Sequence, residues 1–168
     1  MLNPCLYCSA SCCKSYTITV TAFDILRICK ETGKKPEEFA TLHQTRLLSF
    51  DPDTTMDMEN DAWTYILGIK SHPCAFIDKK DRCTVHKTAP MSCRRYPFMM
   101  NGKLNARFCP LASQLLFGMK GPDIGTSDMA KEIELHKKIV KEWNKKLGKK
   151  EECIVFLLKR AEEIAGTP

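Results

Sequence analysis

The sequence predicts an α+β fold: a small single domain in which cysteine-rich loops and hairpins are packed by helices, with a helical pair at the C-terminus. Three observations lead to this prediction. Apolar residues recur at helical spacing within residues 21–43 and again after residue 128, short strand-like runs lie between them, and eight of the ten cysteines fall in two groups. Hydrophobic residues make up 43% and charged residues 27%, so the 168-residue chain can form an ordinary core.

The first helix is expected to begin at residue 22, because Thr21 can cap it and Asp24 follows three residues later, as in a capping box. Gly33 is expected to end this helix. Its apolar stripe consists of Ala22, Ile25, Leu26 and Cys29. Pro36 marks a second helix start, and we expect that helix to run to about His43.

Short strands and turns are expected over residues 44–73, with the best strand at residues 63–67. A second hairpin is expected at residues 98–104, because Asn101-Gly102 is the preferred pair of a tight type I′ turn. That hairpin would lie between two cysteines of the second group, Cys93 and Cys109.

The C-terminal segment has the clearest helical pattern. Its apolar stripe consists of Met129, Ile133, His136, Val140, Trp143 and Leu147. Gly148 is expected to end this helix, and residues 151–165 are expected to form an antiparallel partner. We therefore divide the chain into a cysteine-cluster domain over residues 1–120 and a helical hairpin over residues 121–168 that packs on it. Residues 131–150 carry eight lysines and three glutamates, which favours a solvated helix face over an acidic partner.

Hydropathy and charge limit the function classes. The longest apolar run, residues 153–158, is far shorter than the roughly 20 residues that span a bilayer, and the N-terminus lacks secretory-signal features. We therefore expect a cytoplasmic protein with no membrane partner, in which ten cysteines indicate metal binding rather than disulfides. Two four-thiolate metal centres would lower the formal charge of +6 to about +2, so nucleic-acid binding is not needed to explain it.

The candidate ligands form the patterns Cys5-x2-Cys8-x3-Cys12-Cys13 and Cys74-x8-Cys83-x9-Cys93, followed by Cys109. A two-residue gap lets both sulfurs of a pair approach one metal. Neighbouring side chains of an extended chain point to opposite sides, so we expect Cys12 and Cys13 to stand between two centres or to bind two irons of one cluster. Arg94, Arg95 and Arg107 are placed to neutralise nearby thiolates.

Several motifs together resemble the YkgJ-type cysteine-cluster family over roughly residues 1–110. They are Cys5-x2-Cys8-x3-Cys12-Cys13, Pro73-Cys74-Ala75-Phe76-Ile77-Asp78, Cys83-Thr84-Val85-His86, Pro90 and Cys93-Arg94-Arg95-Tyr96-Pro97-Phe98. Members are described as zinc- or iron-chelating proteins and are often named Fe–S oxidoreductases, and a similar motif in flagellin lysine N-methylases is linked to a [4Fe–4S] cluster. The resemblance implies that all eight cysteines are cluster residues. This chain departs from the pattern at His86, where the family usually has Tyr, and at Ala89-Pro90, where it usually has Arg-Pro.

Other interpretations of these residues stay open. His72 or His86 could be the fourth ligand of a three-cysteine zinc site, although eight cysteines already complete two four-ligand sets. Disulfides, or a redox dithiol at Cys5 and Cys8, are less favoured. The remaining cysteines, Cys29 and Cys153, lie on apolar helical stripes and are expected in the core.

These observations predict an iron–sulfur protein with one or two [4Fe–4S] clusters, acting in electron transfer or as an oxidoreductase component with a redox or client protein as partner. The alternative is a zinc-binding structural or interaction module without catalysis. Whether the chain is an enzyme stays open, since the sequence contains no phosphate loop, dinucleotide fingerprint or nucleophile–base pair.

Overall fold

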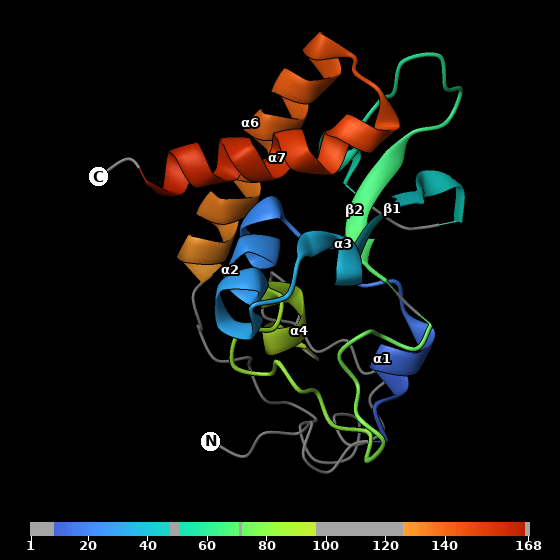
Figure 1. Ribbon diagram of the computed structural model, residues 1–168, viewed down its shortest axis with the longest axis vertical. Coiled ribbons are helices and arrows are strands. Elements are labelled where there is room, and N and C mark those ends of the chain that lie inside the picture. Colours follow the sequence, from blue (N-terminus) through green and yellow to red (C-terminus); the bar gives the residue numbers. More distant parts are fainter. Residues whose placement is uncertain (1–8, 48–50, 71, 97–125, 167–168) are drawn as a thin grey trace.

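The computed structural model describes residues 9–47, 51–70, 72–96 and 126–166, and it confirms the α+β class (Figure 1). The helices are α1 (Ser11–Ser15), α2 (Ala22–Thr32), α3 (Pro36–Phe39), α4 (Met91–Arg95), α6 (Thr126–Lys146) and α7 (Lys150–Ala165). The strands are β1 (Ala40–Gln44) and β2 (Tyr65–Ile69). Two short 3₁₀ helices, η2 (Thr45–Leu47) and η3 (Pro52–Thr54), lie between them in the chain. The hairpin expected at residues 98–104 lies outside the described residues.

Helix α2 begins and ends where the sequence predicts. The Thr21 side chain accepts the Asp24 backbone N–H, and the Asp24 carboxylate accepts the Thr21 backbone N–H, which confirms the capping box. Gly33 ends the helix in the left-handed conformation, with φ 67°. Ile25 and Ile28 are fully buried, so the helix presents its apolar face to the core.

The second predicted helix is much shorter than expected. It ends at Phe39, and the chain enters β1, so the expected continuation to His43 is wrong. β1 pairs antiparallel with β2, with Ala40 opposite Ile69 and Gln44 opposite Tyr65. Pairing with a strand distant in sequence overrides the local helical signal in this segment.

Strand β2 lies two residues later than the predicted strand, and all five of its residues are buried. On the side away from β1 it contacts residues 18–20, because Val20 donates its N–H to the Leu67 carbonyl and Ile69 donates to Ile18. Gly68 is needed here, since a Cβ at this position would lie 2.7 Å from the His43 ring. Ile18, Thr19 and Ile69 thereby form one side of the candidate site.

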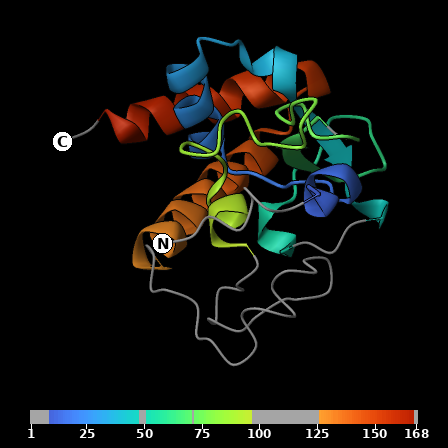
Figure 2. The ribbon, with the colours of Figure 1, turned by 90° about the horizontal axis from the view of Figure 1, so that it is seen from below.

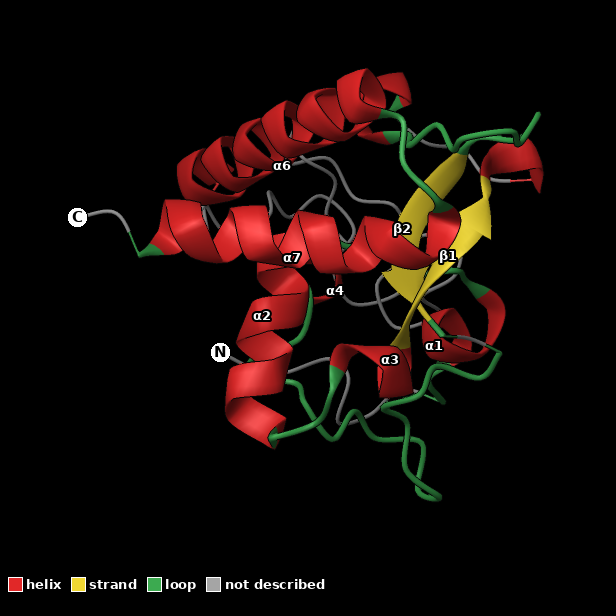
Figure 3. Cartoon of the chain, turned by 45° about the horizontal axis from the view of Figure 1, so that its top comes forward, coloured by secondary structure: helices red, strands yellow, loops and turns green. Residues whose placement is uncertain are grey.

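Helices α6 and α7 form the predicted C-terminal hairpin, and α7 also packs on α2 (Figure 3). Trp143 is fully buried and donates its indole N–H to the Asp57 carbonyl at 2.8 Å. Gly148 allows the turn to approach this ring, because a Cβ there would lie 2.7 Å from it. Cys153 is fully buried in the same core, as predicted, whereas Cys29 is partly buried. The split into domains at residue 120 stays a prediction.

Helix α1 and the loop of residues 72–90 lie at the end of the molecule away from the α6–α7 turn (Figure 1), and α4 lies between this end and the first turns of α6 (Figure 2). This end carries the cysteines of both predicted groups that the structure describes. Within the described ranges, no helix has the length and apolar character to cross a bilayer.

Candidate metal centre

Five cysteines line one cavity of about 200 Å³ at this end of the molecule. They are Cys12, Cys13, Cys74, Cys83 and Cys93. The structure thus brings together segments that are far apart in sequence, from both predicted groups. Cys5, Cys8 and Cys109 lie outside the described residues. Metal binding by these eight cysteines stays a prediction.

Cys12 and Cys13 face the same cavity because this part of the chain is helical. Ala10 takes the left-handed conformation, with φ 54°, and starts α1, where the Lys14 N–H donates to the Ala10 carbonyl at 3.0 Å. Successive helical side chains are about 100° apart rather than opposed. The extended chain that the sequence-based expectation assumed is thus absent, and whether the two thiols bind two centres or two irons of one cluster stays a prediction.

The distance between the two sulfurs leads to a second correction. The Cys12 and Cys13 Sγ atoms lie 3.9 Å apart. Two thiolates on one tetrahedral zinc, with Zn–S bonds of about 2.3 Å, would be about 3.8 Å apart. Adjacent cysteines in this helix can therefore share one ion, contrary to our expectation from the sequence.

A tight loop places Cys74 and Cys83 on the cavity wall. The Cys74 N–H donates to the Cys13 carbonyl at 2.8 Å, which joins the loop to α1. Ile77 and Cys83 form an isolated antiparallel bridge. The turn between them is held by the Asp78 carboxylate, which accepts backbone N–H groups of Lys80 and Arg82. This turn directly precedes Cys83 and fixes its position.

Helix α4 brings Cys93 to the cavity. Pro90 precedes the helix and accepts the Cys93 N–H at 2.9 Å. The Met91 N–H donates to the buried Asp24 carboxylate of α2 at 3.1 Å, so α4 is fixed to the core of the fold. Sequence reasoning missed this link, because no local pattern relates residue 24 to residue 91.

The thiols alter one another's protonation. A hydrogen bond from the Cys13 thiol lowers the pKa of Cys12 to about 6, and the same bond raises the pKa of Cys13. Burial raises the pKa of the Cys93 thiol, and the nearby Cys74 and Cys83 sulfurs raise it further. Several thiolates cannot coexist in this cavity without a compensating positive charge. The donor set therefore fits a thiophilic cation or an iron–sulfur cluster.

The remaining wall of this cavity is largely apolar, with Ile18, Ile69, Phe76 and Val85 among its residues. In the ranges that the structure describes, no three Cys, His, Asp or Glu side chains converge on a point where they could hold one metal ion. Of the three arginines expected to neutralise them, Arg94 is exposed and absent from the described wall, and the Arg95 and Arg107 side chains lie outside the described residues.

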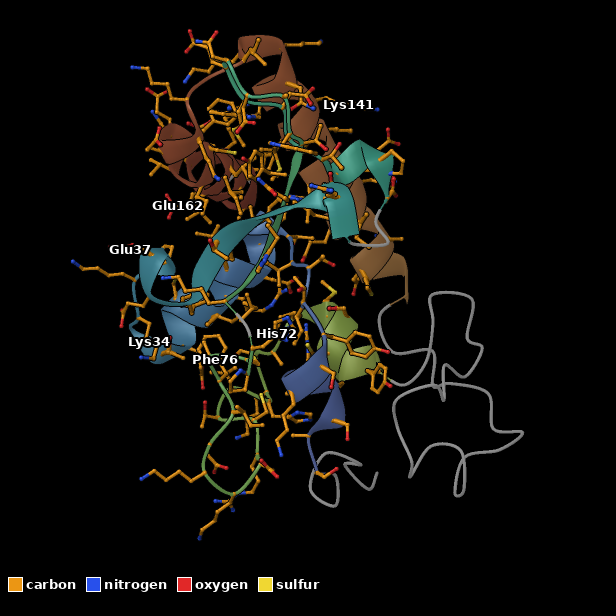
Figure 4. All side chains as sticks on the ribbon, turned by 90° about the vertical axis from the view of Figure 1, so that its right-hand side faces the viewer. Lys34, Glu37, His72, Phe76, Lys141 and Glu162 are labelled. Carbon is orange, nitrogen blue, oxygen red and sulfur yellow. The ribbon has the colours of Figure 1, made fainter. Side chains whose placement is uncertain are left out.

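The two candidate histidines differ. His86 lines the cavity. His72 instead has Nδ1 at 3.3 Å from the Lys14 carbonyl and Nε2 at 3.4 Å from the Thr17 hydroxyl. His72 therefore joins the loop to the α1 segment, as does the 2.7 Å ion pair between Lys14 and Asp81. In Figure 4, His72 and Phe76 lie on this side of the fold, far from the exposed Lys141 of α6.

Thiols from α1, the loop and α4 around one small, mostly apolar cavity define a metal-binding protein of the cysteine-cluster class. Residues 4–110 match the model of the family CxxCxxCC, described as "Putative zinc- or iron-chelating domain", and the chain belongs to this family. No curated protein and no solved structure matches the chain.

Proposed function

We propose that the chain holds an iron–sulfur cluster in the thiol cavity and acts in electron transfer or as the iron–sulfur component of an oxidoreductase. The observation that carries this proposal is that five thiols, from α1, the loop of residues 72–90 and α4, line one cavity. A structural zinc ion requires about four donors at one point. A cluster instead binds its thiolates through different irons, so its ligands surround a volume.

The size and the wall of the cavity support the same proposal. About 200 Å³ is less than the roughly 300–1,000 Å³ of sites for organic ligands, so the cavity suits an inorganic group. The apolar side chains Ile18, Ile69 and Phe76 limit the access of water, which is one of the ways a protein sets the potential of a metal centre.

The chain's own residues have defined roles in this proposal. Cys12, Cys13, Cys74, Cys83 and Cys93 are ligands, together with Cys5, Cys8 and Cys109. The Cys13 carbonyl and the Cys74 N–H hold two ligand segments at a fixed separation. When bound, the cluster supplies one-electron transfer. Since the thiols must stay reduced to bind it, we assign the protein to the cytoplasm and propose a redox or client protein as its partner.

A second candidate function, a zinc-stabilised interaction module, is favoured by one observation. The 3.9 Å separation of the Cys12 and Cys13 sulfurs matches two thiolates on one tetrahedral ion. Four-thiolate zinc sites are closed and structural, so this function would involve no chemistry.

Purification under anaerobic conditions separates the two candidates. We expect brown protein that absorbs broadly, bleaches with dithionite and contains iron and sulfide in equal amounts. Colourless protein with stoichiometric zinc would contradict the iron–sulfur proposal and favour the zinc module. Cys93→Ser should lose most of the bound metal, whereas Cys29→Ser, outside the cavity, should retain it.

A further inference from the structure

The basic charge of the chain is concentrated in one segment. Residues 72–125 carry nine lysines and arginines and three acidic residues, which accounts for the whole formal charge of +6. Residues 1–71 carry seven basic and nine acidic residues, and residues 126–168 carry ten and eight. The structure describes residues 72–96 of the basic segment, which form the loop and α4 beside the thiol cavity. This part alone holds six basic and two acidic residues.

Four exposed cations of this segment form no ion pair with any residue that the structure describes. They are Lys79, Lys80, Lys87 and Arg94, and we call them the cationic rim. The two carboxylates of the loop already have other partners. Asp78 pairs with Arg82 at 3.2 Å, and Asp81 pairs with Lys14 at 2.7 Å. The charge of the cationic rim is therefore uncompensated.

The cationic rim flanks the thiol cavity without lining it. Lys87 directly follows the wall residue His86, and Arg94 directly follows Cys93. The turn that carries the other two cations directly precedes Cys83. None of the four belongs to the described wall of the cavity. Contact with the thiols therefore does not account for these charges, which are presented to solvent beside the metal site.

The chemistry of this surface favours an acidic protein over a nucleic acid. Sites for single-stranded nucleic acid combine cations with aromatic side chains on which bases stack. The large hydrophobic side chains that are exposed in the described ranges are Trp63, Leu147 and Val155, and none belongs to α1, residues 72–90 or α4. Separate cations without an apolar patch instead suit the small, charge-guided interfaces of transient redox complexes.

We propose that the cationic rim is the docking surface for a partner protein with an acidic patch. Complementary charge accelerates the encounter of two proteins and orients them. Because the rim flanks the thiol cavity, it brings the acidic patch to the side of the molecule that carries the metal ligands. This inference deepens the proposed function and rests on it for the role of the partner in electron transfer, whereas docking itself depends on the rim alone.

Fluorescence anisotropy with a labelled decaglutamate peptide tests the cationic rim on the metal-loaded full chain. We expect saturable binding at about 20 mM salt and its loss at about 500 mM, because the Debye length falls from about 20 Å to about 4 Å. The triple variant Lys79→Gln, Lys80→Gln, Lys87→Gln should weaken binding about tenfold, since three of the four rim charges are lost.

A matched control removes three exposed lysines from α6. The triple variant Lys138→Gln, Lys141→Gln, Lys145→Gln changes the net charge equally, at positions that form no ion pair within the described ranges. This control should bind decaglutamate like the wild type. Equal losses in the two triple variants, or no saturable binding at low salt, would overturn the proposal. Tighter binding of decathymidylate than of decaglutamate would show a nucleic-acid surface and would overturn it as well.

Metal and sulfide analysis of the same samples tests the proposed function separately. All three proteins should hold the same metal, because none of the substituted lysines lines the thiol cavity. Rim-dependent binding by colourless, zinc-loaded protein would contradict the iron–sulfur proposal and keep the docking surface. Brown protein that binds decaglutamate independently of the rim would do the reverse.

Discussion

At the scale of single residues, the backbone of Ala10 decides how the Cys12–Cys13 pair meets the cavity. Its φ of 54° and ψ of 33° lie in the left-handed region, which costs a residue with a Cβ about 1–2 kcal/mol. The residue is also buried, at 6% exposure, so the fold holds it in this conformation. The strained residue lies between Cys8 and Cys12 of the first predicted cysteine group.

Ala10→Gly should therefore stabilise the protein by about 1 kcal/mol, because glycine adopts positive φ without the steric cost. Chemical unfolding of the metal-loaded protein measures the change. Ala130→Gly, on the exposed face of α6, is the control and should lower stability by about 1 kcal/mol. Equal losses in the two variants would show that Ala10 is not strained.

The two histidines beside the cysteine loops give a second prediction at this scale. Under thiolate-only ligation, His86→Ala and His72→Ala should both retain the full metal content. His72→Ala should nevertheless lose about 1 kcal/mol of stability, because its ring joins the Lys14 carbonyl to the Thr17 hydroxyl. Metal analysis and unfolding of both variants check this. Loss of metal from His86→Ala alone would identify a histidine ligand.

Residue patterns predicted local features well and spatial ones poorly. The Thr21–Asp24 capping box and the buried Cys153 followed from spacing alone, because a helix fixes which neighbours meet. The relative direction of the Cys12 and Cys13 side chains did not follow from spacing, since it depends on whether that short segment is extended or helical. The contact of Met91 with Asp24 depends on tertiary packing and leaves no trace in sequence spacing.

At the scale of elements, α6 joins α2 through a buried histidine. His136 accepts the Ala22 N–H at the first turn of α2, where helix N–H groups lack intrahelical partners. The heptad-like spacing of α6 predicted that His136 is packed, and it is. No local pattern predicted β1, because its partner strand β2 lies beyond two intervening turns. Element identity was thus predictable for the long periodic helices and for β2, which lies two residues later than predicted, but not for β1.

The α6–α2 contact should make stability depend on pH. Burial lowers the pKa of His136 from 6.5 to about 4, so the unfolded chain binds a proton that the folded chain rejects between these values. This contribution is complete above pH 6.5 and is lost as the pH falls toward 4. Between pH 7.5 and pH 5 the loss should be about 2 kcal/mol.

His136→Gln, which keeps an acceptor for the Ala22 N–H, should lack this loss. Urea unfolding of both proteins at the two pH values gives the difference. Burial and Glu132 raise the pKa of Asp24, which acts in the opposite direction but is common to both proteins. An identical pH dependence in the two proteins would show that His136 is not held neutral.

At the scale of the whole molecule, the fold combines a conventional core with a thiol-lined end. Trp143, Leu157 and Ile25 belong to a buried cluster that includes α2, the sheet, α6 and α7. α1, residues 72–90 and α4 meet around the thiol cavity, held by contacts such as Cys74 N–H to Cys13 and Met91 N–H to Asp24. Cys74, Phe76 and Val85 extend the buried cluster to the cavity wall, so the two parts are continuous.

Metal removal should therefore loosen one end of the molecule and spare the other. The free energy of metal binding is coupled to the folding of the segments that carry the ligands, whereas α2 and α7 pack through apolar side chains that need no ligand. Hydrogen exchange measured with and without a chelator should speed up by about tenfold or more in α1, residues 72–90 and α4. The amides around Cys153 should stay protected. Uniform acceleration along the chain would show that the metal organises the whole fold, and no acceleration would show that the cysteine end is stable without it.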